Sequence, residues 1–244
     1  MIRRWTPLLL AAGLLAGACG GGDDQTVLVL AASSLTDAFG EMEVAFEQAN
    51  PGVDVDVSFA ASSALRLQID QGAPADVVAV ANEAVMTELA GEGHVAVPTV
   101  FATNELVIAA PVDGSASISG AESLADPGLL VGLCAVQVPC GQYASEALAL
   151  AGIEPEVDTF ESDVRSLTTK LAIGELDVGV VYATDAASRP DDIEVIGPLD
   201  GADVRYPIAP LMDAPHAENA AAFIAFVLSD EGRAVMEAAG FGTP

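Results

Sequence analysis

Apolar runs alternate with amphipathic stretches along most of the chain. Residues 27–30 are continuously apolar, which predicts a buried strand, and residues 35–49 repeat apolar side chains at the spacing of one helix face. The same alternation continues with strands at 53–59 and 76–80 and a short helix at 64–71. Strands that follow one another with a helix between them predict an α/β fold with a mainly parallel sheet and crossover helices.

A second α/β set follows the first, and no low-complexity linker separates the two. Its expected elements are strands 105–111, 129–133 and 176–182 and helices 142–150 and 163–173, followed by a strand at 204–212 and helices 217–228 and 230–239. We expect two lobes between which the chain crosses twice, near residues 102–104 and 204–206. The first lobe then comprises residues 27–103 and 206–244, and the second comprises residues 104–205.

Two turns after predicted strands share a pattern of small residues and paired serines. AASSL occupies residues 31–35 and AASSAL occupies residues 60–65, so that Ser34 and Ser62 each stand just before a predicted helix. The first turn of a helix carries unpaired N–H groups and a partial positive charge, and small residues let an anion come close. In a parallel sheet both turns lie at the carboxyl edge, where ligands bind. The turns predict two halves of one anion site; the alternative is that each serine only caps its helix.

Charge excludes one class of partner. The chain is 52% hydrophobic, enough for a large core, and its formal net charge is −28, with Lys170 as its only lysine. Phosphate recognition needs clustered Lys and Arg, so we expect no nucleic-acid partner. A net charge this negative affects solubility rather than the fold. We hypothesise that it reflects a high-salt habitat.

The first residues have the pattern of an export signal. Two arginines precede an apolar stretch at 8–18 that is too short to span a bilayer and ends in small residues. LLAGAC, ending at Cys19, resembles a bacterial lipoprotein signal. We expect a lipoprotein signal peptide at 1–18, lipidation of Cys19 and a tether at 19–26, with ordinary secretory cleavage as the alternative. In either case the protein is exported, and the lipid would hold it at the outer face of the cytoplasmic membrane or in the periplasm.

Two cysteines remain once Cys19 is assigned to the lipid. Five residues lie between Cys134 and Cys140 in GLCAVQVPCG. In an exported chain such a pair predicts a small disulfide loop, with two buried thiols as the alternative. We expect no metal site, because only His94 and His216 are available and neither is near a cysteine in sequence.

Four segments together carry a resemblance to a known family. They are AASSLTDAF, SFAASSALRLQIDQGAPADVV, VPCGQYASEAL and DVRSLTTKLAIGELDVGVVYATDA. In this order they resemble the periplasmic molybdate-binding proteins of ABC importers, and the likeness runs in register from about Val27 to Phe241. GAPADVV alone is common among extracellular solute-binding proteins, whereas the ordered series is specific. The resemblance implies a two-lobed periplasmic-binding-protein fold of class II type, in which each lobe is a mainly parallel sheet flanked by helices.

The resemblance also implies a ligand and its contacts. The family's oxyanion contacts fall on Ser34, Ser62, Cys140, Val164 and Tyr182. The serines would supply hydroxyl and backbone donors, Cys140 and Val164 backbone N–H groups, and Tyr182 its phenol. The family more often has alanine at position 140, so a disulfide there could stiffen or reshape the loop. A monomer would capture molybdate, and also tungstate, between its lobes and deliver it to an ABC permease, without a cofactor, enzymatic activity or a direct protein ligand to molybdenum.

Other readings of the same residues remain. We expect Arg165 and Arg66 to lie outside the site and Asp163 to cap its helix. A donor-only pocket favours a fully deprotonated dianion, but the binder could take sulfate, thiosulfate or an organic acid instead. A serine hydrolase is a remote alternative, because neither Ser34 nor Ser62 lies in a Gly-x-Ser-x-Gly motif. A structural or adhesive lipoprotein would leave the paired serine turns without a purpose.

Overall fold

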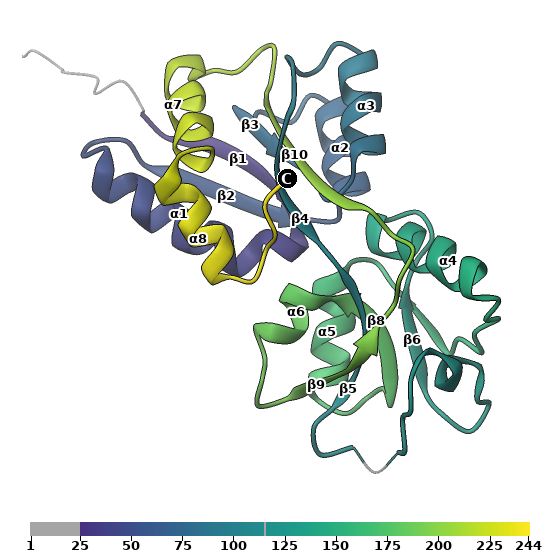
Figure 1. The fold of residues 1–244 in the computed structure, drawn as a ribbon. Coiled ribbons are helices and arrows are strands. Elements are labelled where there is room, and N and C mark those ends of the chain that lie inside the picture. The colour runs from purple at the N-terminus through teal and green to yellow at the C-terminus, as the bar shows by residue number, and fades with distance from the viewer. Residues whose placement is uncertain (1–24, 115) are drawn as a thin grey trace, which may run out of the picture.

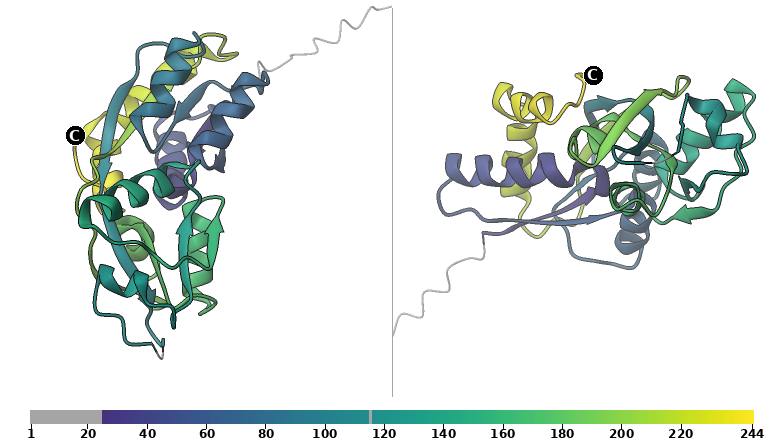
Figure 2. Two further views of the ribbon diagram at one scale, coloured as in Figure 1. Left: turned by 90° about the vertical axis from the view of Figure 1, so that its right-hand side faces the viewer. Right: turned by 90° about the horizontal axis from the view of Figure 1, so that it is seen from below.

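The computed structural model describes residues 25–114 and 116–244, and the predicted signal segment and Cys19 lie outside the described residues. The described chain forms two lobes, each built on a five-stranded sheet (Figure 1). The lobes lie one beyond the other, which makes the molecule elongated (Figure 2). Within these ranges no helix is both long enough and apolar enough to cross a membrane.

The sheet of the first lobe has the strand order β2-β1-β3-β10-β4. Its strands are β1 (Val27–Ala32), β2 (Val55–Ala60), β3 (Val77–Ala79), β4 (Thr99–Asn104) and β10 (Val204–Pro210). One face is covered by α2 (Ser62–Asp70) and α3 (Glu83–Gly91), the other by α1 (Thr36–Ala49), α7 (Ala217–Val227) and α8 (Asp230–Ala238) (Figure 1). Leu30 packs into the core under α2 and α3, whereas Val29 and Ala31 pack into the core under α1 and α7. Because both faces are covered, β1 is a continuous apolar run.

The sheet of the second lobe has the strand order β7-β6-β8-β5-β9. Its strands are β5 (Leu106–Pro111), β6 (Val131–Cys134), β7 (Thr159–Glu161), β8 (Val178–Tyr182) and β9 (Ile193–Pro198). Its helices are α4 (Pro139–Ala151), α5 (Val164–Ala172) and α6 (Ala183–Ala187), and short 3-10 turns lie at Ser33–Leu35 in the first lobe and Ala121–Ala125 in the second. The two-lobed α/β fold predicted from the sequence is confirmed.

Both sheets are mixed but mainly parallel, as predicted, because in each sheet one strand runs against the other four. In the first lobe β1 is parallel to β2 and β3, whereas β10 is antiparallel to β3 and β4. In the second lobe β6 is parallel to β7 and β8, whereas β5 is antiparallel to β8 and β9. The strands that run against the others are β10 in the first lobe and β5 in the second, and each is the first strand after the chain passes between the lobes. A strand that arrives from the other lobe runs against the crossover strands of the sheet it joins.

The junction between the lobes is packed and hydrogen-bonded. A single residue, Glu105, separates β4 from β5, and residues 199–203 join β9 to β10. At the end of β4, the side-chain amide of Asn104 donates from Nδ2 to Thr184 Oγ1 at 2.9 Å. The ring of Tyr206 packs edge-on against the rings of Tyr182 and Phe241. Side chains from both lobes therefore meet at one buried point.

The disulfide predicted from the cysteine spacing is present. It joins Cys134, the last residue of β6, to Cys140 in the first turn of α4, with the Cα atoms 5.8 Å apart. Gly141 follows, and a Cβ added there would lie 2.1 Å from the carbonyl oxygen of Ala135. The disulfide thus closes the loop between β6 and α4. The residue that follows it, Gly141, lies so close to the backbone of the loop that only glycine fits.

Replacing both bonded cysteines by serine should lower the free energy of unfolding by about 2 kcal/mol, because a short closed loop restricts the unfolded chain. Urea denaturation of the wild type and the double variant measures the difference. Reductant should destabilise the wild type by a similar amount and leave the Cys134→Ser/Cys140→Ser variant unchanged. Equal stability of the two proteins without reductant would contradict a stabilising role.

Candidate anion-binding site

The residues predicted as oxyanion contacts line one small cavity between the lobes. Ser34 and Ser62 approach it from the first lobe, and Cys140, Val164 and Tyr182 approach it from the second. The complete lining is Ala32, Ser33, Ser34, Ala61, Ser62, Ala81, Val138, Pro139, Cys140, Asp163, Val164 and Tyr182. Each predicted residue stands at or just after the carboxyl end of a strand, namely β1, β2, β6, β7 or β8.

Helix starts differ from the predicted ones in a way that matters for the site. Ser34 lies in the 3-10 turn Ser33–Leu35, which leads into α1, and Ser62 is the first residue of α2 rather than a residue before it. Helix α4 begins at Pro139, earlier than the predicted start at residue 142, so Cys140 lies inside its first turn. Proline suits the first helical position because its missing N–H would be unpaired there anyway. The backbone amide of Cys140 is therefore a first-turn donor.

Asp163 caps α5, as predicted, and leaves the first amide of that helix free for other use. Its Oδ1 accepts from the backbone N–H of Ser166 at 2.9 Å, and its Oδ2 accepts from Ser166 Oγ at 2.9 Å. The N–H of Val164 is not among the groups that Asp163 binds, and Val164 lines the cavity. The carboxylate of Asp163 stabilises the helix, and its oxygens are engaged there.

The two serine side chains do not cap their helices, so the capping alternative is wrong. Neither α2 nor the turn at Ser33–Leu35 has a side-chain cap hydrogen bond. Instead, Ser34 Oγ lies 2.9 Å from Tyr206 Oη, and Ser62 Oγ accepts from the backbone N–H of Ala81 at 3.0 Å. Ser34 is 8% exposed and Ser62 is 1% exposed. Both hydroxyls are buried and held by groups outside their own helices.

The hydroxyl of Tyr182 has no hydrogen-bond partner among the described residues, although the side chain is only 1% exposed. Burial raises the pKa of this phenol well above its ordinary value, so the hydroxyl keeps its proton at neutral pH. A buried donor without a partner costs about 1–3 kcal/mol. An acceptor placed in the cavity would remove that cost.

Neutral donors dominate this cavity. Among the described residues, the lining contains no Lys or Arg, and its one acidic residue is Asp163, which caps α5. Asp185, three residues after Tyr182, is buried, and desolvation raises the pKa of its carboxyl well above the ordinary value, which favours the neutral acid. The cavity offers about 10 Å³ to the centre of a water-sized sphere, about the room of one water molecule. Pockets for organic ligands hold roughly 300–1,000 Å³. At this size the cavity excludes an organic acid, and a tetrahedral oxyanion enters only if the lining moves apart.

Two polar contacts hold the lobes together beside the cavity. Arg165 on α5 makes a two-pronged ion pair with Asp37 on α1, at 2.7 and 2.8 Å. Asn82 Nδ2 donates to Gln142 Oε1 at 2.9 Å. Arg165 is absent from the cavity lining, in agreement with its predicted place outside the site. Its partner on the opposite lobe could not be predicted, because residues 37 and 165 are far apart in sequence.

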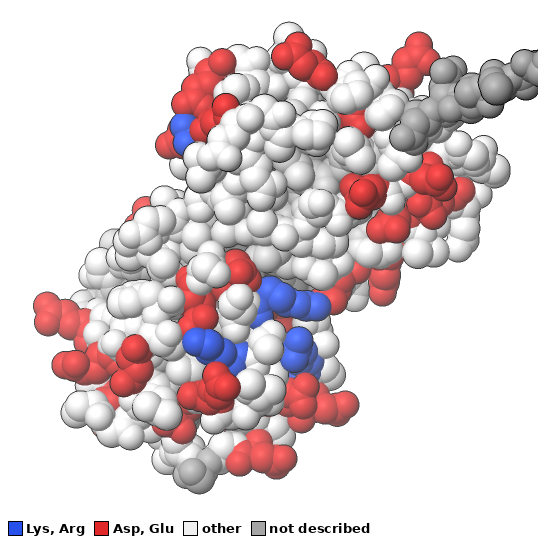
Figure 3. Space-filling view, turned by 180° about the vertical axis from the view of Figure 1, so that it is seen from behind, with Lys and Arg blue, Asp and Glu red and all other residues white. Residues whose placement is uncertain are grey.

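Surface charge is mostly negative, with one basic region. Figure 3 shows Lys and Arg side chains gathered on the second lobe close to its junction with the first, among Asp and Glu side chains. Arg165 and Lys170 line a polar hollow that shares Ser33 and Asp163 with the cavity. Lys170 is paired with Glu161 at 2.7 Å. The hollow also contains the acidic side chains of Glu161 and Asp163, so its cations lie among acids.

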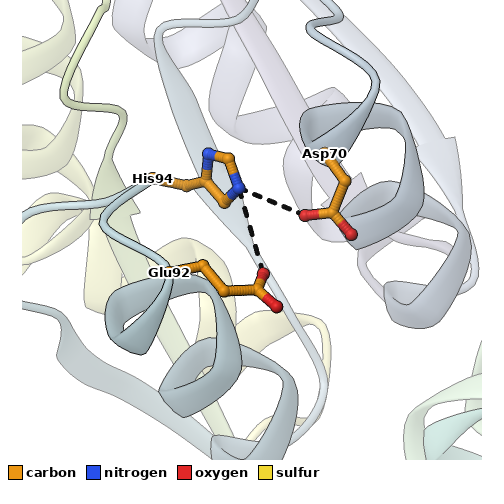
Figure 4. Close-up of side chains that lie close together, drawn as sticks. All are labelled: Asp70, Glu92 and His94. Atoms are coloured by element: carbon orange, nitrogen blue, oxygen red, sulfur yellow. Dashed lines mark ion pairs between the residues drawn. The ribbon is translucent and has the colours of Figure 1, made fainter.

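A separate cluster on the outer face of the first lobe was not predicted. Asp70, Glu92 and His94 each turn one potential ligand atom toward the others, within 4.8 Å (Figure 4). Arg66 binds both carboxylates, at 3.3 Å for Asp70 and 2.7 Å for Glu92, so these acids already have a fixed cation. The exposed cluster is an ion-pair network remote from the cavity, and Arg66 lies outside the site, as predicted.

Two α/β lobes that close on a small, donor-lined cavity are the architecture of solute-binding proteins. The chain matches the family described as bacterial extracellular solute-binding protein over residues 27–242, and it belongs to this family. The family consists of binding proteins that act outside the cytoplasm, so the serine-hydrolase alternative is dropped. Accordingly, the described contacts of the histidine rings are with carboxylates: His94 with Asp70 and Glu92, and His216 with Asp76.

Individual relatives are similar over nearly their whole length. The molybdate-binding protein ModA of Mycobacterium tuberculosis (strain ATCC 25618 / H37Rv) is 35% identical over 260 residues, covering 99% of this chain and 100% of the relative. A putative ABC transporter substrate-binding lipoprotein, YvgL of Bacillus subtilis (strain 168), is 28% identical over 97% of this chain and 94% of the relative. The solved sulfate-binding protein SubI of M. tuberculosis H37Rv has a TM-score of 0.79 at 18% identity, over 89% of this chain and 86% of that one. At that identity the likeness concerns the fold alone.

Replacing Tyr182 by phenylalanine should raise the melting temperature of the ligand-free protein. The substitution removes a buried hydroxyl that has no hydrogen-bond partner among the described residues. Tyr206→Phe is the matched control, because it removes a hydroxyl that is bonded to Ser34 and Asn104 and should cost about 1 kcal/mol. Thermal unfolding without ligand measures both variants. A loss of stability in Tyr182→Phe as large as in the control would show that the hydroxyl has a partner.

Replacing Asp37 by asparagine should favour opening of the lobes and weaken ligand binding by about two- to fivefold, the range for an exposed ion pair. The hydrogen bond from Arg165 lowers the pKa of Asp37. The ion pair therefore contributes fully above about pH 4, the ordinary value, and its contribution is lost as pH falls through the lowered pKa.

Small-angle scattering of the ligand-free protein against pH measures this opening. Glu41→Gln is the control, because it removes a charge from the same helix at a residue for which no ion pair is found in the described part of the chain. Identical scattering of the Asp37→Asn variant and the wild type at pH 7 would contradict a role of the ion pair in closure.

Proposed function

We propose that the protein captures molybdate between its lobes, takes tungstate as a second ligand, and delivers the anion to an ABC permease. The observation that carries this proposal is the buried, unpartnered hydroxyl of Tyr182 in a cavity that collects hydroxyl and first-turn amide donors. An oxyanion without a proton accepts hydrogen bonds at every oxygen and donates none, so it satisfies these donors together. The similarity to ModA of M. tuberculosis supports molybdate as the anion.

Each contact has a defined role in this proposal. Ser34, Ser62 and Tyr182 donate through their hydroxyls, and Cys140 and Val164 donate through backbone N–H groups. Molybdenum is held only as the oxyanion, with no protein atom bound to the metal. The lobes that close on it are residues 27–103 with 206–244, and residues 104–205.

Sulfate is the alternative anion; the solved sulfate-binding protein SubI has a similar fold, which by itself favours neither anion. Sulfate also accepts at every oxygen, so the donor pattern alone does not distinguish it from molybdate. The distinction rests on size, because sulfate is smaller and leaves longer contacts to a ring of rigid amides. The proposal therefore requires that molybdate bind much more tightly than sulfate.

Delivery to the membrane follows from the same proposal. Lipidation of Cys19 would hold the protein near its permease, and the similarity to the lipoprotein YvgL supports this arrangement. We propose a monomer, because the single closed cavity is complete within one chain. Transport energy would come from the partner ATPase, since this chain only binds and releases the anion.

Titration calorimetry of the purified protein with molybdate, tungstate, sulfate and phosphate tests the proposed function. We expect tight one-to-one binding of molybdate and tungstate and much weaker binding of sulfate and phosphate. In Ser62→Ala the molybdate affinity should fall by about tenfold or more, the effect of one hydrogen bond to a charged group.

Ser63→Ala is the control for this variant, because Ser63 is the neighbouring residue and does not line the cavity. Its affinity should equal that of the wild type. Sulfate binding as tight as molybdate binding would overturn molybdate as the ligand and leave the anion site in place.

A further inference from the structure

Tyr206 is hydrogen-bonded to the proposed site through Ser34, and its ring packs against the ring of Tyr182. Its hydroxyl lies 2.9 Å from Ser34 Oγ, and the side chain is fully buried in β10, at 0% exposure. Tyr206 does not line the cavity. The direction of this hydrogen bond decides what Ser34 can offer to a ligand, because each hydroxyl has a single proton.

Asn104 sets that direction. Its Oδ1 accepts from the backbone N–H of Glu105 at 2.9 Å, and a backbone N–H can only donate. The amide orientation is thereby fixed, and Nδ2, which only donates, faces Thr184 Oγ1 at 2.9 Å and Tyr206 Oη at 3.4 Å. The Tyr206 oxygen therefore accepts on the side of Asn104, and its proton is left for Ser34.

The proton of Ser34 is then free for the cavity. Because Ser34 Oγ accepts from Tyr206, its own hydrogen can point toward a ligand. The proton of Ser62 is also free for the cavity, because Ser62 Oγ accepts from the backbone N–H of Ala81 at 3.0 Å. Hydrogen bonds that run in one direction polarise one another and strengthen the last donor. Both serines thus present a proton rather than a lone pair.

We propose that Tyr206 is a specificity-determining positioning residue, which holds the Ser34 hydroxyl as a donor and so makes the site prefer oxyanions that carry no proton. This inference rests on the proposed function. A protonated tetrahedral anion must place its O–H against an acceptor, whereas both serines accept from the protein and turn their protons toward the cavity, and the Asp163 carboxylate in the lining already accepts from Ser166. Without the Tyr206 hydroxyl, Ser34 Oγ could rotate and accept.

Hydrogen arsenate is the probe for this preference, because it is a tetrahedral dianion that keeps one proton at neutral pH. Calorimetry compares molybdate and arsenate in the wild type, Tyr206→Phe, Ser34→Ala and the double variant. In Tyr206→Phe we expect molybdate affinity to fall about tenfold while arsenate affinity holds or rises, so that selectivity falls about tenfold or more. In the Ser34→Ala background, Tyr206→Phe should not change selectivity, because Tyr206 acts through Ser34.

A role of Tyr206 in stability alone would lower both affinities by one factor and leave selectivity unchanged, which would overturn the inference. If Tyr206→Phe does not fold, Asn104→Asp replaces it. A carboxylate oxygen in place of Nδ2 would accept from Tyr206, turn the Ser34 proton out of the cavity, and produce the same loss of selectivity. Absence of molybdate binding by the wild type would refute the proposed function. Molybdate binding with unchanged selectivity in the variants would refute this inference alone.

Discussion

Hydrogen-bond donors that converge in one buried space between the lobes are the constraint on which this structure depends. First-turn amides of α4 and α5 and the hydroxyls of Ser34, Ser62 and Tyr182 converge on one cavity. Burying donors costs free energy unless something accepts from them. The protein keeps them close because two folded lobes place their strand ends opposite each other. An anion supplied to the cavity satisfies both lobes at once.

The α/β topology explains how donors from both lobes reach one point. In each lobe the parallel strands end at the same edge, and the next helix or turn starts there. Small residues such as Ala32, Ala61 and Ala81 line the cavity, so little side-chain bulk separates a ligand from the backbone. The strands β4, β5 and β10 lie where the chain passes between the lobes and place Asn104 and Tyr206 beside the site. The junction that holds the lobes together is thus also part of the hydrogen-bond network behind Ser34.

Much of this arrangement could be predicted from the sequence, because its signals are local. Each of these signals lies within a short stretch of sequence: the apolar run of β1, the amphipathic face of α1 and the paired serines. The early start of α4 was missed although Pro139 marks it, and the very short β7 has too few residues to show a period. Pairings between distant residues had no local signal: Ser34 with Tyr206, Asp37 with Arg165, and the antiparallel partners of β10. They depend on the tertiary fold, which brings together segments separated by more than a hundred residues.

The central claim is that the cavity between the lobes holds a molybdate ion by neutral donors from both. A crystal structure grown with molybdate, with anomalous data collected at the molybdenum absorption edge, tests it most directly. The account predicts one strong anomalous peak between Ser34, Ser62 and Tyr182, with oxygens in hydrogen-bond contact with these hydroxyls and with the amides of residues 140 and 164. A peak elsewhere, or an empty cavity at saturating molybdate, would contradict it.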